Sequence, residues 1–557
     1  MNKNHPTVGE ALVNLLADYG VELVFGIPGT HSIELYRGLQ SGRIRHISPR
    51  HEQGGGFMAD GYARVSGKPG VCFVITGPGV TNITTPMGEA YMDSVPMLVI
   101  SPVNPLDVNR INRGRLHEIT DQAAVTAPLT AFSQTIESAD DLPEAIARAF
   151  AVFSSQRPRP VHLHIPLPLL HEHVTEFWQP AELPGLPVAS QTEIDYALSW
   201  IEQADNPVIV AGGGMIEGAE ALDSLARKLH CPVLTTVAGR GVISQSHPLG
   251  LGAQLRAPAT QAVLQAADLG IFLGTEFAQT DHWNDDIQLP GRQIWINICP
   301  DTLDRDAYRV FTPPSNSDTA KKEELITIQA DCRDAAERLA KGAKQPDPER
   351  MARVDTLCAR TREAHQNVRT GKEAHHWLAL QGIMRAVDTH VTIVSDMTQL
   401  AYTAVDYLPM SRPKQWLHPT GYGTLGYALP AAIGAALARP DDPCLAIIGD
   451  AGFQYTFAEM TLAAELELNL VVLLWNNHAL QQICDDMDNA NIERIGIFQR
   501  NPDFIGLAEA CHWGVERVEL VDRREVGQAL HDALMKAFER PGPVLVMLED
   551  RETSPDD

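Results

Sequence analysis

The chain has 557 residues, enough for about three domains, and 44% of them are apolar, which supports sizeable buried cores. Its formal net charge of −26 argues against nucleic acid and anionic membranes as partners. The sequence has no apolar run long enough to span a bilayer, and its first residues lack the pattern of a secretory signal. The eight scattered cysteines contain no CxxC pair, so we expect reduced thiols in a cytoplasmic protein.

The first segment, residues 1–172, alternates helical and strand patterns. A helix is expected over 8–19, strands over 23–25, 44–47, 71–75 and 97–101, and a small-residue helix over 57–65. This alternation predicts a doubly wound α/β domain. Glu52 follows one of these strands and precedes three glycines, which leave room for another group to pack against the helix start. A helix-start carboxylate favoured by the macrodipole would explain the same residue.

A second domain is predicted over 190–340, after a proline-rich linker at 171–190. It opens with a helix at 194–203, and strands follow at 208–210, 233–235, 269–273 and 294–298. The pattern is Rossmann-like, but AGGGMIEG at 211–218 does not fit the GxGxxG fingerprint. Dinucleotide binding is therefore not established by this stretch.

A charged linker at 341–372 precedes the third predicted domain, residues 373–557. Its first strand, 391–394, enters the loop Ser395–Leu400. A glycine-rich turn, Gly421–Gly426, precedes a helix at 430–437. The chain thus reads as three doubly wound domains with parallel sheets.

The stretch from Cys444 to Asn477 reads as strand, crossover helix and strand, with the helix expected over 455–466. Asp450 and Asn477 then follow neighbouring strands at their carboxyl ends, where open α/β sheets bind ligands. A carboxylate and an amide oxygen suit Mg²⁺ shared with a phosphate. Ala451 and Gly452 are small enough to let a diphosphate approach the backbone.

Four motifs in order give the chain a resemblance to thiamine-diphosphate enzymes of the acetolactate synthase type. They are HEQGGGFMADGYAR, TGPGVTN, the 421–426 turn and the GD…NN stretch. The resemblance implies a pyrimidine-binding first domain, a central Rossmann-like domain and a diphosphate-binding third domain. It implies that Asp450, Asn477 and the Ala479 carbonyl hold Mg²⁺.

The same resemblance assigns roles around the cofactor. Glu52 would hydrogen-bond the aminopyrimidine and favour the tautomer that removes the C2 proton. The Gly423 carbonyl would receive the 4′-amino group, and Leu425 would wedge between the two rings. Gln399 and Leu400 would contact the diphosphate. In acetolactate synthases the central domain binds FAD, but here Glu276 replaces the arginine of the matching stretch, so FAD is not expected.

The segment after the metal stretch bears on the substrate. Gln482, Asp485 and Asp486 stand where acetolactate synthases have an apolar helix with a tryptophan. Carboxylates there suit a guanidinium tail, although a solvated acidic face explains them equally well. TGYGTLGY, SDMTQLAYT and NNxALxQIxDDM resemble the 2-ketoarginine (5-guanidino-2-oxopentanoate) decarboxylases of arginine catabolism.

His117 stands where the family's pocket has a Phe-Gln-Glu stretch. It could orient the substrate carboxylate or relay a proton, although a lone histidine is more often a packing or surface residue.

The sequence therefore predicts a decarboxylase that converts 5-guanidino-2-oxopentanoate to 4-guanidinobutanal and CO₂. The alternatives are an acetolactate synthase-like carboligase acting on pyruvate and a non-catalytic subunit. The family builds its sites between subunits, which implies a homodimer or homotetramer.

Overall fold

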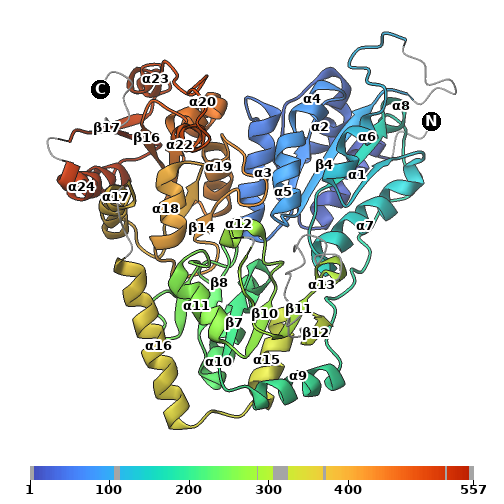
Figure 1. Ribbon diagram of the computed structural model, residues 1–557. Coiled ribbons are helices and arrows are strands. Elements are labelled where there is room, and N and C mark those ends of the chain that lie inside the picture. The colour runs from blue at the N-terminus through green and yellow to red at the C-terminus, as the bar shows by residue number, and fades with distance from the viewer. Residues whose placement is uncertain are drawn as a thin grey trace.

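The computed structural model describes residues 5–105, 113–284, 286–304, 324–367, 372–520 and 523–550. They form three six-stranded sheets, each with helices on both faces (Figure 1). Every pairing within the three sheets is parallel. The predicted fold class is confirmed, whereas the exact domain boundaries stay a prediction.

The N-terminal sheet has the order β2-β1-β3-β4-β6-β5. Its strands are β1 (Leu23–Gly26), β2 (Arg45–Ile47), β3 (Gly70–Phe73), β4 (Met97–Val103), β5 (Phe132–Thr135) and β6 (Val161–Pro166). Its main helices are α1 (Val8–Asp18), α2 (Ile33–Leu39), α3 (Glu52–Ser66), α4 (Pro78–Asn82), α5 (Thr84–Met92), α6 (Gln122–Thr126) and α7 (Leu142–Ser155).

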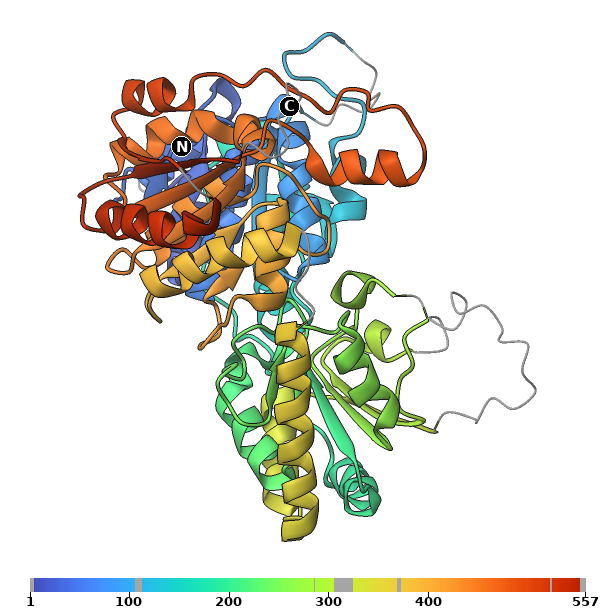
Figure 2. The same ribbon diagram turned by 60° about the vertical axis from the view of Figure 1, so that its left-hand side comes forward.

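The central sheet has the order β12-β11-β10-β7-β8-β9 and lies below the other two in Figure 1. Its strands are β7 (Pro207–Ala211), β8 (Val233–Thr235), β9 (Gly250–Gly252), β10 (Leu269–Leu273), β11 (Arg292–Asn297) and β12 (Glu324–Gln329). Its main helices are α9 (Gln191–Gln203), α10 (Ala219–Leu229), α11 (Pro258–Ala266), α15 (Cys332–Gly342) and α16 (Pro348–Asn367). Helix α16, expected as part of a linker, runs along this domain (Figure 2) and buries Val354 and Cys358 in its core.

The C-terminal sheet has the order β14-β13-β15-β16-β18-β17. Its strands are β13 (Thr392–Ser395), β14 (Trp416–Leu417), β15 (Cys444–Gly449), β16 (Leu470–Asn476), β17 (Gly514–Val518) and β18 (Val544–Glu549). Its helices are α17 (Lys372–Ala386), α18 (Gln399–Tyr407), α19 (Ala428–Ala438), α20 (Asp450–Thr456), α21 (Met460–Glu465), α22 (Gln481–Asn489), α23 (Phe504–Ala510) and α24 (Val526–Phe538).

Two helix predictions need correction. The helix expected from Phe57 begins at Glu52, because His51 caps it and accepts the Gln53 N–H through its ring nitrogen at 3.1 Å. The continuous helix expected over 455–466 is instead α20, a 3₁₀ turn at Phe457–Glu459 and α21. The 3₁₀ turn places Glu459 against the start of α3, where it accepts the Arg50 N–H at 3.0 Å.

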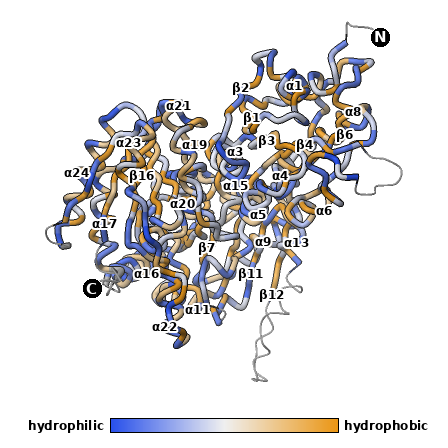
Figure 3. The backbone as a smooth tube through the Cα atoms, turned by 90° about the horizontal axis from the view of Figure 1, so that it is seen from above, coloured by the Kyte–Doolittle hydropathy of each residue, from blue (hydrophilic) through white to orange (hydrophobic). Residues whose placement is uncertain are grey.

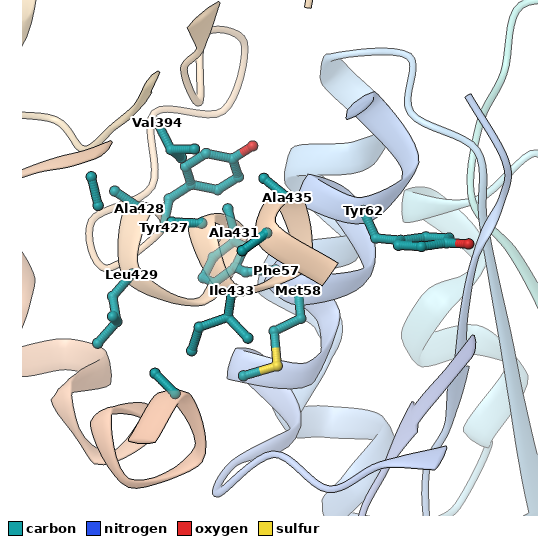
Figure 4. Close-up of a cluster of buried hydrophobic side chains, with 14 of the residues drawn as sticks. Phe57, Met58, Tyr62, Val394, Tyr427, Ala428, Leu429, Ala431, Ile433 and Ala435 are labelled. Atoms are coloured by element: carbon teal, nitrogen blue, oxygen red, sulfur yellow. The ribbon is translucent and has the colours of Figure 1, made fainter. Parts of the chain in front are cut away.

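The N- and C-terminal domains pack through α3 and α19 (Figure 4). Small residues let the two backbones meet: a Cβ on Gly61 would lie 2.0 Å from the Ala431 carbonyl oxygen, and one on Gly434 would lie 1.9 Å from that of Met58. Apolar residues of both helices fill one shared core. This contact fixes the start of α3, and thus Glu52, relative to the C-terminal sheet.

Two further observations concern the surface and the thiols. None of the described helices is both long and apolar enough to cross a bilayer. All eight cysteines are free thiols, and seven of them are buried.

Candidate active site

The two ends of the GD…NN stretch meet as predicted. Strands β15 and β16 are parallel neighbours, and Gly449 is paired with Trp475 at their carboxyl ends. Asp450 is the first residue of α20, and Asn477 directly follows β16. The side chains of both residues are therefore delivered to one edge of the sheet.

Asp450, Asn477 and Ala479 are brought together at this edge. The Asn477 amide faces Asp450 Oδ1 at 3.0 Å and the Ala479 carbonyl oxygen at 2.9 Å, distances that suit its nitrogen as a donor. When the Asn477 amide oxygen faces these two atoms instead, it lies together with Asp450 Oδ1 and the Ala479 carbonyl oxygen. Three oxygens of this kind are the donor set of a hard cation such as Mg²⁺. All three residues are buried, and burial raises the pKa of the Asp450 carboxyl. The residues thus fit a divalent cation, which would favour the ionised carboxylate.

Asn501 is a residue of this site that the sequence reasoning missed. Its Nδ2 donates to Asp450 Oδ2 at 2.7 Å and to Asn476 Oδ1 at 2.8 Å. It orients Asp450 from a loop 51 positions away, so no local spacing could have indicated it. Among the described residues, no cluster of three or more His, Cys, Asp and Glu side chains could hold a metal.

Asp396, also missed, ties the loop after β13 to the end of the glycine-rich turn and the start of α19. Its buried carboxylate accepts the backbone N–H groups of Met397 at 2.9 Å, Gly426 at 3.2 Å and Ala428 at 3.0 Å. Burial raises its pKa to about 6. A Cβ on Gly452 would lie 2.8 Å from Asp396 Oδ1, so the glycine is needed for this contact whether or not a diphosphate also approaches.

The Gly421–Gly426 turn is tight, as predicted, with φ of +71° at Gly423 and +81° at Gly426. Two carboxylates of the N-terminal domain, Glu89 on α5 and Asp93 just after it, hold this turn. Asp93 accepts the Gly421 N–H at 2.8 Å, and Glu89 accepts the Thr424 hydroxyl at 2.9 Å. Burial and the neighbouring Asp93 raise the pKa of Glu89 to about 9, so Glu89 is neutral at pH 7.

Glu52 stands at the first turn of α3, half-buried. Its Oε2 accepts from Asn82 Nδ2 at 3.0 Å, and a Cβ on Gly79 would lie 3.4 Å from its Oε1. The contacts that hold it therefore come from the TGPGVTN motif. The Glu459 side chain occupies the space predicted beside the glycines, because a Cβ on Gly54 would lie 2.2 Å from Glu459 Oε1.

The acidic segment forms helix α22, at the outer margin of the C-terminal domain in Figure 3. Asp485 is half-buried and accepts from Gln399 Nε2 and Gln481 Nε2, both at 3.0 Å. Asp486 is exposed and accepts from Gln482 Nε2 at 3.2 Å. Burial is the main cause that raises the pKa of Tyr402 to about 12, and the charges of Asp396 and then Asp486 add to it. The predicted substrate residues thus lie together on one helix, which Gln399 ties to the loop after β13.

The remaining predicted residues, Leu425, Leu400 and His117, differ in how exposed they are and in what they contact. Leu425 is half-exposed and accessible to a ligand, whereas the Leu400 side chain is buried in the core. The Leu400 backbone N–H lies in the first turn of α18, where N–H groups have no partner within the helix. His117 lies in the N-terminal domain beside the Gly77 turn, where a Cβ on Gly77 would meet its carbonyl oxygen at 2.5 Å.

Glu276 of the central domain has an identified partner. Arg157, just after α7, donates to Glu276 Oε2 at 2.8 Å and to Oε1 at 3.1 Å. Glu276, which replaces the arginine expected for FAD binding, therefore joins the central domain to the N-terminal domain.

The fold and this site are those of a thiamine diphosphate enzyme, and comparison with known families agrees. Models of the N-terminal, central and C-terminal domains of thiamine pyrophosphate enzymes match residues 6–125, 194–338 and 396–548. The chain belongs to this family, and its cofactor is thiamine diphosphate.

Individual relatives match along almost the whole chain. The probable 2-ketoarginine decarboxylase AruI of Pseudomonas aeruginosa is 46% identical over 526 residues, which cover 93% of this chain and 90% of that protein. The large subunit of acetolactate synthase isozyme 1 of Escherichia coli is 32% identical over 550 residues, which cover 97% of this chain and 93% of that protein. The acetolactate synthase large subunit of Corynebacterium glutamicum is 30% identical over 555 residues, which cover 95% of this chain and 84% of that protein. The predicted resemblance is confirmed.

Proposed function

We propose that this enzyme decarboxylates 5-guanidino-2-oxopentanoate to 4-guanidinobutanal and CO₂. The observation that carries the proposal is the Gln399–Asp485 hydrogen bond of 3.0 Å, which ties the acidic helix to the loop predicted at the diphosphate. Asp485 and Asp486 would then face the far end of a substrate whose 2-oxo acid group is at the cofactor. A guanidinium pairs well with carboxylates in this arrangement. The 46% identity to the probable 2-ketoarginine decarboxylase supports the same substrate.

The residues around the cofactor each have a proposed task. Asp450, Asn477 and the Ala479 carbonyl would hold Mg²⁺, with Asn501 orienting Asp450. Bound thiamine diphosphate supplies an electron sink for the loss of CO₂. Glu52 would hold a proton at the aminopyrimidine, and Gln399 with the first turn of α20 would face the diphosphate. Glu89 and Asp93 position the turn that carries Gly423 and Leu425.

The test is CO₂ release with thiamine diphosphate and Mg²⁺, comparing 5-guanidino-2-oxopentanoate with pyruvate. We expect the wild type to prefer the guanidino acid and Asp486→Ala to lose about 10- to 100-fold in kcat/KM for it, the value of a charged hydrogen bond. Asp488→Ala is the matched control, because Asp488 lies on the same helix but pairs with Arg494 at 2.6 Å. Equal losses in both variants, or a preference for pyruvate, would contradict the proposal.

The alternative is a carboligase acting on pyruvate, which the relatives among acetolactate synthases favour. Acetolactate as the product, with no aldehyde from the guanidino acid, would establish it. In that case the carboxylates of α22 would serve only as a solvated face.

We further propose that the central domain holds no FAD. Glu276 is engaged by Arg157, so this position offers a flavin a carboxylate in place of the expected arginine. The cavity between the central and C-terminal domains, lined by Asp281, Trp283 and Met397 among others, has a volume of about 50 Å³. Ligand pockets of cofactor size are commonly about 300 Å³ or more. A yellow purified protein with a stoichiometric flavin would refute this.

We propose that the active sites form between subunits of a homodimer or homotetramer. Ile33 on α2 and Leu116 are 54% and 61% exposed, and a second copy would cover these apolar side chains. Glu52→Gln and Asp450→Ala subunits would each be inactive alone. Mixed after co-expression, they should regain up to about a quarter of the sites, because half of random dimers carry one intact pair. No recovery would place each site within one chain.

The free thiols support a cytoplasmic location.

A further inference from the structure

The central domain contains a cavity of about 430 Å³ at the amino ends of β8 and β9. Its walls come from the end of α10, from the residues that lead into β9 and from α16. The lining residues that matter here are Arg227, His230, His247, Leu249, Asp355 and Arg362. The turn after β7 and Glu276 after β10 lie at the opposite, carboxyl edge of the sheet. The cavity is therefore separate from the stretch compared with the FAD site.

Arg362 on α16 is held in place by the chain that leads into β9. Its Nη1 donates to the Pro248 carbonyl oxygen at 2.7 Å and to that of Gly250 at 3.3 Å. None of the described residues accepts a hydrogen bond from its Nε or Nη2. A planar guanidinium that is fixed on one side and has donors left on the other is preorganised for an oxyanion.

Arg227 reaches the cavity from the last turn of α10. Its Nε donates to Asp223 Oδ2 at 2.7 Å, and no described residue accepts from its two terminal nitrogens. The carboxylate that lines the cavity, Asp355, already has a partner, because His230 Nε2 lies 2.9 Å from its Oδ1. Both carboxylates near the cavity are thus engaged, whereas both arginines keep donors without acceptors.

His247 forms part of the wall between the two arginines. The residue is 7% exposed, and its Nδ1 accepts the Leu249 N–H at 3.2 Å, so the neutral ring carries its proton on Nε2. This buried Nε2 makes no hydrogen bond to a described residue, although Asp223 Oδ1 lies 3.3 Å away. Burial first lowers the pKa of His247, and the charges of Arg227 and Arg362 lower it further, against the effect of Asp223. The charges of two separate helices therefore converge on one place.

The composition of the chain does not account for this group of basic residues. The protein has a formal net charge of −26, yet two arginines and two histidines line this cavity beside a single aspartate. Placing two guanidinium groups around one cavity is unfavourable unless an anion compensates them.

We propose that this cavity binds the phosphate or carboxylate group of a small metabolite. The fixed guanidinium of Arg362 would take two oxygens of the anion, and the more flexible Arg227 would reach it from α10. Ligand pockets commonly have volumes of about 300–1,000 Å³, so the cavity also has room for the uncharged part of such a molecule. Pro248 and Leu249 offer this part an apolar contact.

The cavity adjoins the contact between the central and C-terminal domains. The Gln245 N–H, two residues before His247, donates to the Met410 carbonyl oxygen of the C-terminal domain at 3.3 Å. Helix α16 leads along the chain to α17, the first helix of that domain. An anion that joins α16 to the chain before β9 would therefore stabilise the contact between these two domains.

The first test is calorimetric titration of the holoenzyme, saturated with thiamine diphosphate and Mg²⁺ so that the cofactor site is filled. The probes are inorganic phosphate, AMP and succinate. We expect at least one of them to bind with a Kd of about 1 mM or lower. Arg227→Gln and Arg362→Gln should each raise that Kd about tenfold or more, because each removes a charged donor. No binding by any probe, or the same Kd in both variants as in the wild type, would overturn the proposal.

The three probes also distinguish the source of the anion. Binding of phosphate and AMP, but not of succinate, would assign the site to a phosphorylated metabolite, and the reverse would assign it to a carboxylic acid. AMP binding more tightly than phosphate would show that the uncharged part contributes.

Arg353→Gln is the matched control. Arg353 lies on the same helix as Arg362, and its side chain is 56% exposed, compared with 60% for Arg227. It pairs with Glu349 and does not line the cavity. Its replacement should leave the Kd within about twofold of the wild type. A loss equal to that of Arg227→Gln would mean that the probes respond only to the overall charge.

Thermal denaturation gives a second readout that requires no turnover, so it is valid even if the proposed substrate is wrong. A ligand that binds only the folded protein raises the melting temperature, and the probe that binds should do so for the wild type and Arg353→Gln. His247→Asn keeps an acceptor for the Leu249 N–H and removes the Nε2 donor, so its shift should be smaller. An equal shift in Arg227→Gln and the wild type would place the probe elsewhere and overturn the proposal.

Discussion

Two adjoining parts of the C-terminal domain are built in opposite ways. The residues proposed to hold Mg²⁺, Asp450, Asn477 and Ala479, are 2%, 8% and 6% exposed and are fixed by the strand ends and by Asn501. Helix α22 begins two residues after Ala479, yet five of its nine residues are exposed and six are polar. The buried part would hold the metal and diphosphate of the cofactor. The exposed part can change sequence without disturbing the sheet, so it is the natural place for substrate choice.

The largest expected effect separates these two parts directly. Asp450→Ala removes the only carboxylate of the oxygen site, and we expect no measurable binding of thiamine diphosphate in the presence of Mg²⁺. Asp486→Ala should leave that binding within about twofold, because Asp486 is on the exposed helix. Tryptophan fluorescence titration measures both. A similar loss of cofactor affinity in the two variants would show that the parts are not independent.

A smaller effect is expected at Asn501. Asn501→Ala leaves the proposed ligands in place but removes the donor that orients Asp450. Residues of this kind typically change metal affinity or activity by about 10- to 100-fold. A Mg²⁺ titration of activity at saturating thiamine diphosphate should show the weaker affinity, with kcat recovering at high Mg²⁺. An unchanged Mg²⁺ requirement would limit Asn501 to packing.

The last effect is on stability rather than on cofactor binding, and it concerns pH and the turn that carries Gly423. Glu89 has a folded-state pKa of about 9, above the ordinary value of 4.5. The folded state therefore keeps a proton that the unfolded state has lost, and the stability from neutral Glu89 declines as pH rises from 4.5 through about 9. Glu89→Gln carries no titrating group there. The melting temperature of the wild type should fall relative to the variant across this window, and parallel curves would refute the assignment.

The sequence predicted the parts of the site that depend on local pattern. A GD after one buried run and an NN after the next, joined by a crossover, required neighbouring parallel strands, and β15 and β16 are neighbours. The glycines after Glu52 predicted close packing, and Glu459 occupies that space. The packing partner itself could not be predicted, because Glu459 lies more than 400 positions from Arg50 and only the docking of α3 on α19 brings them together.

Residues that act through a second residue were missed for the same reason. Asn501, Asp396 and Glu89 hold other groups by hydrogen bonds that cross loops or domains. The continuous helix expected after Asp450 was wrong because periodicity does not reveal a 3₁₀ turn whose purpose is a contact with another domain.

The near-contact of the α3 and α19 backbones has a consequence for protein engineering. Replacing a helical glycine by alanine is a routine stabilising change, commonly worth about 0.4–1 kcal/mol. At Gly434 the added methyl would lie 1.9 Å from the Met58 carbonyl oxygen, and at Gly61 it would lie 2.0 Å from that of Ala431. The same substitution would therefore push two helices apart and displace the carboxyl group at the start of α3. A thermostabilisation campaign guided by helix propensity alone would choose these two positions early and lose activity there.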